Sequence, residues 1–297
     1  MKSLIKNIST LSILFSAVIF FQSCEETCPG VIFTTPVTGD TVSVPLDATL
    51  ASQKRNVILQ DYTGVRCVNC PDGHLVAKTI QDSYAEGRVV TVALHSGIIL
   101  TGPYPFGTHD FRTTEGDDIE SLVGPISSKP IGDINRRLFS GQSGRPVARS
   151  LWSGFVAQEM ADSIPKVQMK TEHTFDNATR ILSLDIILQF AESISNNLNM
   201  HVMLTESGLI EPQLGGPNGG PTGIDTFYVH NHVLRDMITP SVGSPIIGNK
   251  SPGHATKYLM PDFEIPASWN ADSVHIVTFV TVTDSLNVLQ VIENKLK

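Results

Sequence analysis

The chain after residue 54 begins with a strand, a helix and a second strand in the pattern of its apolar residues. Val57 to Tyr62 is a short, mostly apolar run, and Arg88 to Leu94 is a β-branched run typical of a strand buried on both faces. Between them, apolar residues recur at helical spacing from Pro71 to Tyr84, and Gly87 suits the position after a helix. This succession predicts a βαβ unit.

The next stretch is less regular. Residues 96–127 contain a loop-like GPYPFG segment and a polar segment, Phe111 to Val123, that we expect to form a helical insertion. A proline then precedes a short strand over residues 131–136, and the pattern from Val147 to Met160 predicts a helix.

The pattern changes to period two after Pro165. Alternation over residues 167–171, 182–190 and 200–204 predicts three adjacent antiparallel strands, with hairpin turns at residues 176–177 and 195–197. Residues 227–234, 274–282 and 288–292 supply further strands, and the Gly/Pro-rich residues 214–221 form an exposed loop. Strands at this spacing without helices favour a β-sandwich.

The N-terminus has the pattern of an export signal. Lys2 and Lys6 precede an apolar run of eleven residues from Leu11 to Phe21, about half the length of a spanning helix. Phe21-Gln22-Ser23-Cys24 resembles the lipobox of bacterial lipoproteins, which implies cleavage before Cys24 and attachment of acyl chains, palmitate among them, to that cysteine. A soluble secreted protein with an ordinary signal-peptidase site is the alternative.

Charge narrows the class of partner. The chain has 21 Lys and Arg against 29 Asp and Glu, a net charge of −8, and removal of residues 1–23 brings it near −10. Nucleic-acid binding depends on clustered cations, so we expect no nucleic-acid partner.

The four cysteines, at positions 24, 28, 67 and 70, carry the chemistry of the sequence. Cys67-Val68-Asn69-Cys70 lies where the first predicted strand meets the helix, so helix N–H groups stabilise a thiolate at Cys67, the expected nucleophile, with Cys70 as the resolving cysteine. This arrangement resembles the thioredoxin superfamily. The resemblance implies a cis-proline beside the cysteines that helps to bind extended polypeptide; Pro130 matches it, and Pro125 is a weaker match.

The lipobox, the segment around Cys67, the Pro130-Ile131-Gly132 segment and residues 228–235 together resemble the outer-membrane-protein-twenty-eight-related lipoprotein family of the Bacteroidota. The fold class that follows is α/β plus all-β, a thioredoxin-like domain followed by an antiparallel β-sandwich-like domain. We expect a signal peptide at 1–23, a spacer at 24–54, a thioredoxin-like domain at 55–163 and a β-sandwich-like domain at 164–297. The implied location is the outer membrane, lipid-anchored, on its periplasmic or cell-surface face.

Simpler interpretations of the polar residues stay open. Cys67 and Cys70 can form a structural disulfide, or bind zinc with two further ligands such as His74 and His95, although we expect no metal and no cofactor. Cys28 is left as an odd thiol. His230 and His232 alternate with valines, which predicts the polar face of a strand rather than a ligand pair.

Two functions of different classes follow. The first is an envelope thiol–disulfide oxidoreductase acting on polypeptides through Cys67, Cys70 and Pro130. The second is a surface-binding or structural lipoprotein in which the disulfide is structural. The sequence does not decide between an enzyme and a binding protein.

Overall fold

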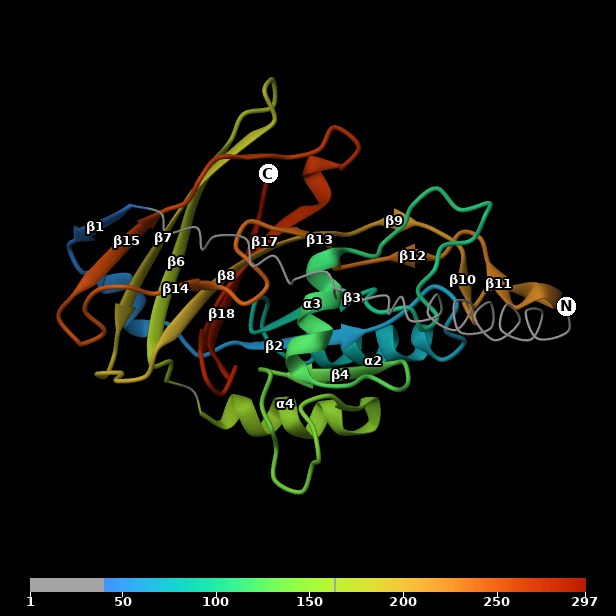
Figure 1. Ribbon diagram of the computed structural model, residues 1–297, viewed down its shortest axis with the longest axis horizontal. Helices are drawn as coiled ribbons and strands as arrows, with labels where there is room; N and C mark the ends of the chain where they lie inside the picture. Colours follow the sequence, from blue (N-terminus) through green and yellow to red (C-terminus); the bar gives the residue numbers. More distant parts are fainter. Residues whose placement is uncertain (1–39, 163) are drawn as a thin grey trace, which may run out of the picture. The chain divides into compact units, whose positions relative to one another are not determined.

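The computed structural model describes residues 40–162 and 164–297. The predicted signal peptide, Cys24, Cys28 and most of the predicted spacer lie outside these residues. The described part is β-rich, with antiparallel and mixed sheets and few helices (Figure 1).

Most strands belong to two large sheets. The nine-stranded sheet has the order β18-β17-β8-β13-β3-β2-β4-β5, with β14 paired to β8. The bounds of its strands are β2 Val57–Tyr62, β3 Val89–Leu94, β4 Ile131–Ile134, β5 Val147–Ala148, β8 Leu198–Glu206, β13 Val233–Met237, β14 Ser244–Pro245, β17 Val274–Val282 and β18 Val288–Lys295.

The five-stranded sheet has the order β1-β15-β7-β16, with β6 along the other side of β7. Its strands are β1 Thr41–Val44, β6 Val167–Phe175, β7 Ile181–Phe190, β15 Ala255–Leu259 and β16 Phe263–Glu264. Two short ribbons pair β9 Leu209–Ile210 with β12 Val229–His230 and β10 Gln213–Leu214 with β11 Ile224–Asp225. The short 3-10 helices are η1 Ala48–Ser52, η2 Arg149–Leu151, η3 Gly220–Thr222 and η4 Ala271–Ser273.

The predicted βαβ unit is confirmed as β2, α2 (Cys70–Asp82) and β3, with the two strands parallel and in register from Val57 opposite Val89 to Tyr62 opposite Leu94. Both strands are buried throughout, because helices cover both faces of the sheet here. Helix α3 (Thr114–Val123), the predicted insertion, packs on one face, and α2 and α4 (Trp152–Ala161) pack on the other (Figure 1).

The helix predicted from Val147 is wrong at its beginning. Val147 and Ala148 form β5, which pairs with Gly132 and Ile131 of β4, and α4 starts at Trp152. The indole of Trp152 lies against Gly132, where an added Cβ would come within 2.8 Å of the ring. Because α4 packs so closely on β4, the residues directly before α4 form the edge strand β5 and the short helix η2 rather than an extension of α4.

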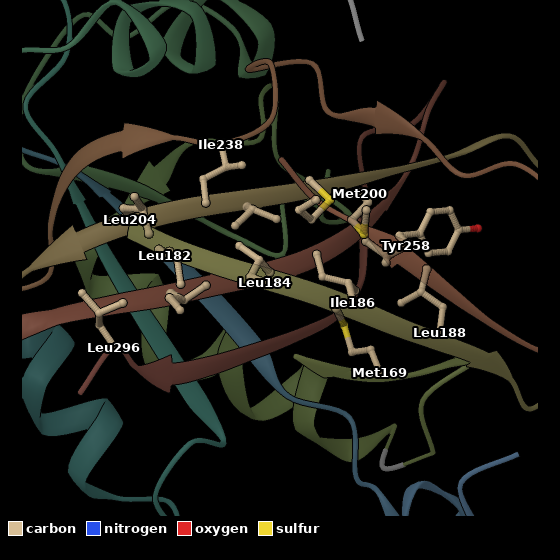
Figure 2. Packing of buried hydrophobic residues seen from close by; sticks show 14 of the residues in the cluster. Met169, Leu182, Leu184, Ile186, Leu188, Met200, Leu204, Ile238, Tyr258 and Leu296 are labelled. Atoms are coloured by element: carbon tan, nitrogen blue, oxygen red, sulfur yellow. The ribbon is translucent and has the colours of Figure 1, made fainter. Parts of the chain in front are cut away.

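The hydrophobic side chains of the two large sheets meet in a cluster that we call the sheet–sheet core. Figure 2 shows Leu182, Leu184, Ile186 and Leu188 following one another along β7, with Leu204 of β8 near the Leu182 end. The alternating residues that predicted these strands are the ones that point into this core.

The pairing of the three predicted adjacent strands is partly wrong. β6 and β7 form the predicted hairpin, with Asp176 donating its backbone N–H to Ile181. β8 does not pair with β7, because the chain crosses after residues 195–197 to the nine-stranded sheet, where β8 pairs with β17 along its whole length. The alternation of β8 fits either sheet, since both bury one face in the sheet–sheet core.

Strands from both sides of residue 163 share the nine-stranded sheet. β13 lies between β3 and β8, parallel to the first and antiparallel to the second. The domain boundaries predicted from the sequence stay a prediction, but a single sheet joins the chain before residue 163 to the chain after it. No helix among the described residues is long and apolar enough to cross a membrane.

Candidate functional site

Cys67 and Cys70 form a disulfide at the start of α2, with an S–S distance of 2.06 Å. Cys70 is the first residue of the helix, and Pro71 occupies a first-turn position where its missing N–H leaves no hydrogen bond unmade. Both cysteines are buried, and Cys67 keeps only 1% of its surface exposed. The two residues predicted as a pair are therefore joined, but a bulky thiol does not reach Cys67 in this conformation.

Pro130 lies beside the same helix. Its peptide bond with Lys129 is cis, as the resemblance to the thioredoxin superfamily implied, and it directly precedes β4. The proline ring packs against Gly73 of α2, where an added Cβ would lie 2.8 Å from the Pro130 Cβ. Its part in binding polypeptide stays a prediction.

Residues 213–217, which we call the covering loop, are attached to the cysteine loop. The Gln213 side-chain N–H group donates to the backbone oxygens of Cys67 (3.0 Å) and Gly64 (3.3 Å), and the Leu214 N–H donates to Val65. Gly215 approaches so closely that an added Cβ would lie 2.1 Å from the Val68 oxygen. The Gly/Pro-rich segment predicted as a free exposed loop is thus held to the cysteines at its beginning.

Asp61 is the residue of the site that the sequence analysis missed. It lies on β2, is 1% exposed, and has one carboxyl oxygen without a hydrogen-bond partner, while the other lies 3.8 Å from Nε2 of His74. Burial raises the pKa of Asp61 to about 8, against the opposing effect of the positive charge of Lys129. The sequence did contain a signal for this site, namely a carboxylate within a mostly apolar run that was predicted to be a strand.

His74 stands one helical turn after Cys70 and connects α2 to the C-terminal half. One ring nitrogen is 2.8 Å from the Thr63 hydroxyl and the other is 2.8 Å from the Tyr228 hydroxyl. Burial lowers the pKa of His74 to about 4, so its ring is neutral at pH 7. Asp61 therefore lies beside a neutral ring that is one helical turn from Cys70, and no charged side chain is in contact with it.

The arrangement does not favour the zinc alternative. The sulfurs of Cys67 and Cys70 are bonded to each other, and both His74 nitrogens are engaged by hydroxyl groups. His95 packs against the rings of Phe111 and His230. Within residues 40–162 and 164–297, no three His, Cys, Asp or Glu side chains are grouped to hold a metal ion.

The interpretation of His230 and His232 as neighbours on one polar strand face is wrong. His230 belongs to β12 and is 1% exposed, whereas His232 lies between β12 and β13 with a left-handed φ of 54°. This change of backbone direction separates the two rings. His230 packs between the rings of Tyr228 and Phe111, and His232 approaches His275.

A cavity of about 710 Å³ lies beside the cysteines. Its floor comes from β2 and β3, one wall from α2, and the other wall from the covering loop and the chain before β13; the lining includes Asp61, His74, Leu75, Thr91, Ala93, Pro217, Tyr228, Val229 and His232. Asp61 and His74 thus line a hollow large enough for a ligand.

Residues 125–297 match the family model of outer membrane protein Omp28. This segment is more than half of the chain and does not include Cys67 or Cys70. No curated protein matches the chain.

Two solved structures from Porphyromonas gingivalis are similar to it. HBP35 has a TM-score of 0.62 and 16% sequence identity, covering 82% of this chain and 76% of its own, which shows a shared fold. A domain of the outer membrane lipoprotein Omp28 has a TM-score of 0.28 and 18% identity, covering 44% of this chain and 88% of its own. The family and the outer-membrane location predicted from the sequence are confirmed by the family match. The chain belongs to the Omp28 family of outer membrane lipoproteins.

Proposed function

We propose that this lipoprotein, anchored through Cys24, is a thiol–disulfide oxidoreductase of the cell envelope with a thioredoxin-like unit around β2, α2 and β3. Cys67 is the nucleophile, Cys70 is the resolving cysteine, and Pro130 shapes the surface that receives an extended polypeptide. The substrate is an exported or surface protein that contains a disulfide.

The observation that carries this proposal is the buried carboxyl group of Asp61, which lies 3.8 Å from the ring of His74, one helical turn after Cys70. A buried carboxyl without a charged partner in contact destabilises a fold, and a structural disulfide has no use for one. A group with a pKa of about 8 can both accept and release a proton near neutral pH, as thiol chemistry requires.

The roles follow from the positions of the groups. In the reduced protein, the Cys67 thiolate attacks a substrate disulfide, which forms a mixed disulfide and expels one substrate thiolate. Cys70 then loses its proton to Asp61 and attacks the Cys67 sulfur, so the mixed disulfide breaks and the second substrate thiolate leaves. Two electrons pass from the cysteine pair to the substrate, and the reverse sequence oxidises a dithiol.

Exposed apolar side chains near the cysteines support a polypeptide substrate. Val68 stands between the two cysteines, and Ile98 and Leu100 belong to the adjacent loop, whose Leu100 oxygen accepts the Arg66 N–H. Large apolar side chains exposed together mark surfaces that bind other proteins.

A structural role for the disulfide is the second candidate, and the low exposure of Cys67 favours it. The covering loop blocks the approach of a thiol, so exchange requires this loop to move away. In that case the chain is a binding lipoprotein, and its disulfide fixes the loop that supports the cavity.

The reduction potential of the Cys67–Cys70 pair distinguishes the two functions. We expect a potential above roughly −300 mV and reduction of insulin disulfides, lost in Cys67→Ser and slowed in Asp61→Asn. A pair that stays oxidised below that potential and shows no turnover contradicts the enzyme and supports the structural disulfide. Release from membranes in Cys24→Ala tests the anchor separately.

A further inference from the structure

The cavity beside α2 has its polar groups at one end. Asp61 on β2 and Thr91 on β3 point to the face of the sheet that α2 covers, and both line the cavity floor. One carboxyl oxygen of Asp61 and the hydroxyl of Thr91 are buried without a hydrogen-bond partner. Thr91 is 6% exposed and Asp61 1%, so both lie in the interior of the fold. Both residues line the hollow, and because unsatisfied buried polar atoms are rare in folded proteins, these two call for an explanation such as a bound molecule.

The rest of the lining is mostly apolar. Leu75 of α2 and Val229 of β12 stand at the rim with 63% and 48% of their surfaces exposed, and Ala93 and Pro217 continue the apolar surface inward. A volume of about 710 Å³ with an apolar lining and a few convergent polar groups is typical of a small-molecule site, and it is too large for a single side chain.

The charged side chains around the cavity are not available to bind a charged ligand. Lys78 and Asp72 are the charged side chains on the α2 wall; Lys78 pairs with Asp82 at 2.7 Å and Asp72 pairs with Arg149 at 2.5 Å. His74 has both nitrogens engaged by hydroxyl groups. A carboxylate placed on the floor would lose its hydration without gaining an opposite charge, and an ammonium group would find only the Asp61 carboxyl, whose ionisation burial opposes.

We propose that this cavity binds an uncharged, largely apolar small molecule whose hydroxyl or carbonyl group hydrogen-bonds Thr91 and Asp61. The site does not require the cysteines to react, so it goes beyond the redox function. The apolar body lies between α2 and Val229, and the polar group reaches the floor.

Competition among ligands of equal length tests the ligand class. Full-length protein is titrated with Nile red, an uncharged fluorescent probe, and the probe is displaced with decanol, decanoate or decylamine. We expect saturable probe binding and displacement by decanol at a concentration at least tenfold below the other two. Absence of saturable binding, equal or better displacement by an ion, or displacement by an unfolded polypeptide but not by decanol overturns the proposal.

A matched pair of threonines tests the position. Thr91→Val removes the cavity hydroxyl and should weaken displacement by decanol about 2- to 10-fold, the effect of one hydrogen bond. Thr205→Val removes another buried hydroxyl without a partner, on β8 and outside the cavity lining, and should leave displacement unchanged. Thr91→Ser keeps the hydroxyl and should bind like the natural protein. If decanol displaces the probe equally well from Thr91→Val and Thr205→Val, the ligand does not hydrogen-bond Thr91, and the proposed position of its polar group is overturned.

Discussion

Two interiors of this chain are built on opposite principles. The sheet–sheet core is filled by apolar side chains of β6, β7, β8 and β17. The layer between α2 and the nine-stranded sheet is apolar over most of its length, but its end near the cysteines contains Asp61 and His74, with His230 beside His74 and the buried Gln213 that holds the covering loop. The first interior stabilises the fold, and the second imposes a desolvation cost that a purely structural layer would avoid.

The difference supports the proposed functional role of the region around Asp61. Burial lowers the pKa of His74 to about 4 and of His230 to about 3, and it raises that of Asp61 to about 8. Shifts in both directions within one region are typical of sites that perform chemistry or bind ligands, because stability alone selects apolar residues there. The comparison between the two interiors gives four predictions, ordered by expected size.

The largest effect is expected in the sheet–sheet core. Leu184→Ala leaves a hollow between β7 and β8 and should lower the free energy of unfolding by about 3–4 kcal/mol, measured by urea denaturation. Insulin reduction and probe binding per folded molecule should not change. A loss of either activity in the folded variant would mean that the two interiors are not separate.

Substitution of Asp61 is expected to raise the free energy of unfolding rather than lower it. Its pKa is about 8 in the folded protein and 3.8 in an unfolded chain, so the folded protein holds the proton more tightly. The free energy of unfolding therefore falls as the pH rises from about 4 to about 8. Asp61→Asn cannot ionise. The shift of about four pKa units corresponds to about 5 kcal/mol at pH 8, and burial of the unpartnered amide offsets roughly 2 kcal/mol of it, so the variant should be more stable by about 3 kcal/mol at pH 8 and no more stable at pH 4.

Urea denaturation of both proteins at pH 4, 6 and 8 checks this sign. The buried histidines oppose the trend on the acid side, but they are the same in both proteins and cancel in the difference. A stability difference independent of pH would show that Asp61 is ionised in the folded protein.

A smaller effect is expected from the covering loop. Gln213→Ala removes the bonds to the Cys67 and Gly64 oxygens and should lower the free energy of opening this loop by about 1 kcal/mol. Reduction of Cys67–Cys70 by dithiothreitol should then be roughly five- to tenfold faster, followed by thiol alkylation and mass spectrometry. Gln142→Ala, on the turn after Phe139, is the control. Equal reduction rates in the two variants would mean that this loop does not control access.

The smallest effect is expected at Lys78, an exposed residue of α2 at the edge of the cavity. Lys78→Ala removes an exposed i,i+4 pair with Asp82 and should change the free energy of unfolding by less than about 0.5 kcal/mol. The same urea titration measures it. A larger loss would assign the Lys78 side chain a packing role in the cavity wall.

The local pattern of apolar residues predicted those helices and strands in which a single hydrophobic period, helical or strand-like, dominates. β2, α2 and β3 could be predicted because each buries residues at its own spacing, and β17 begins and ends where its apolar run does. Pro130 was found through the resemblance of the cysteine motif, and its cis bond agrees.

The remaining features depend on pairings that no local window contains. β8 has the same alternation whether it pairs with β7 or with β17, and the left-handed φ of His232 interrupts a run that looks continuous in the sequence. Asp61 belongs to a strand that the sequence analysis predicted correctly, but it was not recognised as a site residue. The importance of Asp61 depends on its distance to His74 and on its complete burial, neither of which follows from sequence spacing.

The place of β13 between β3 and β8 has a consequence for the order in which the protein is made. β3 ends at Leu94, and its neighbour β13 begins at Val233. During export β3 therefore emerges from the membrane well before β13. Until Val233 emerges, β3 exposes an unpaired edge, which attracts other chains. Folding in the envelope is therefore expected to depend on chaperones during export, and a fragment ending at residue 163 is expected to aggregate.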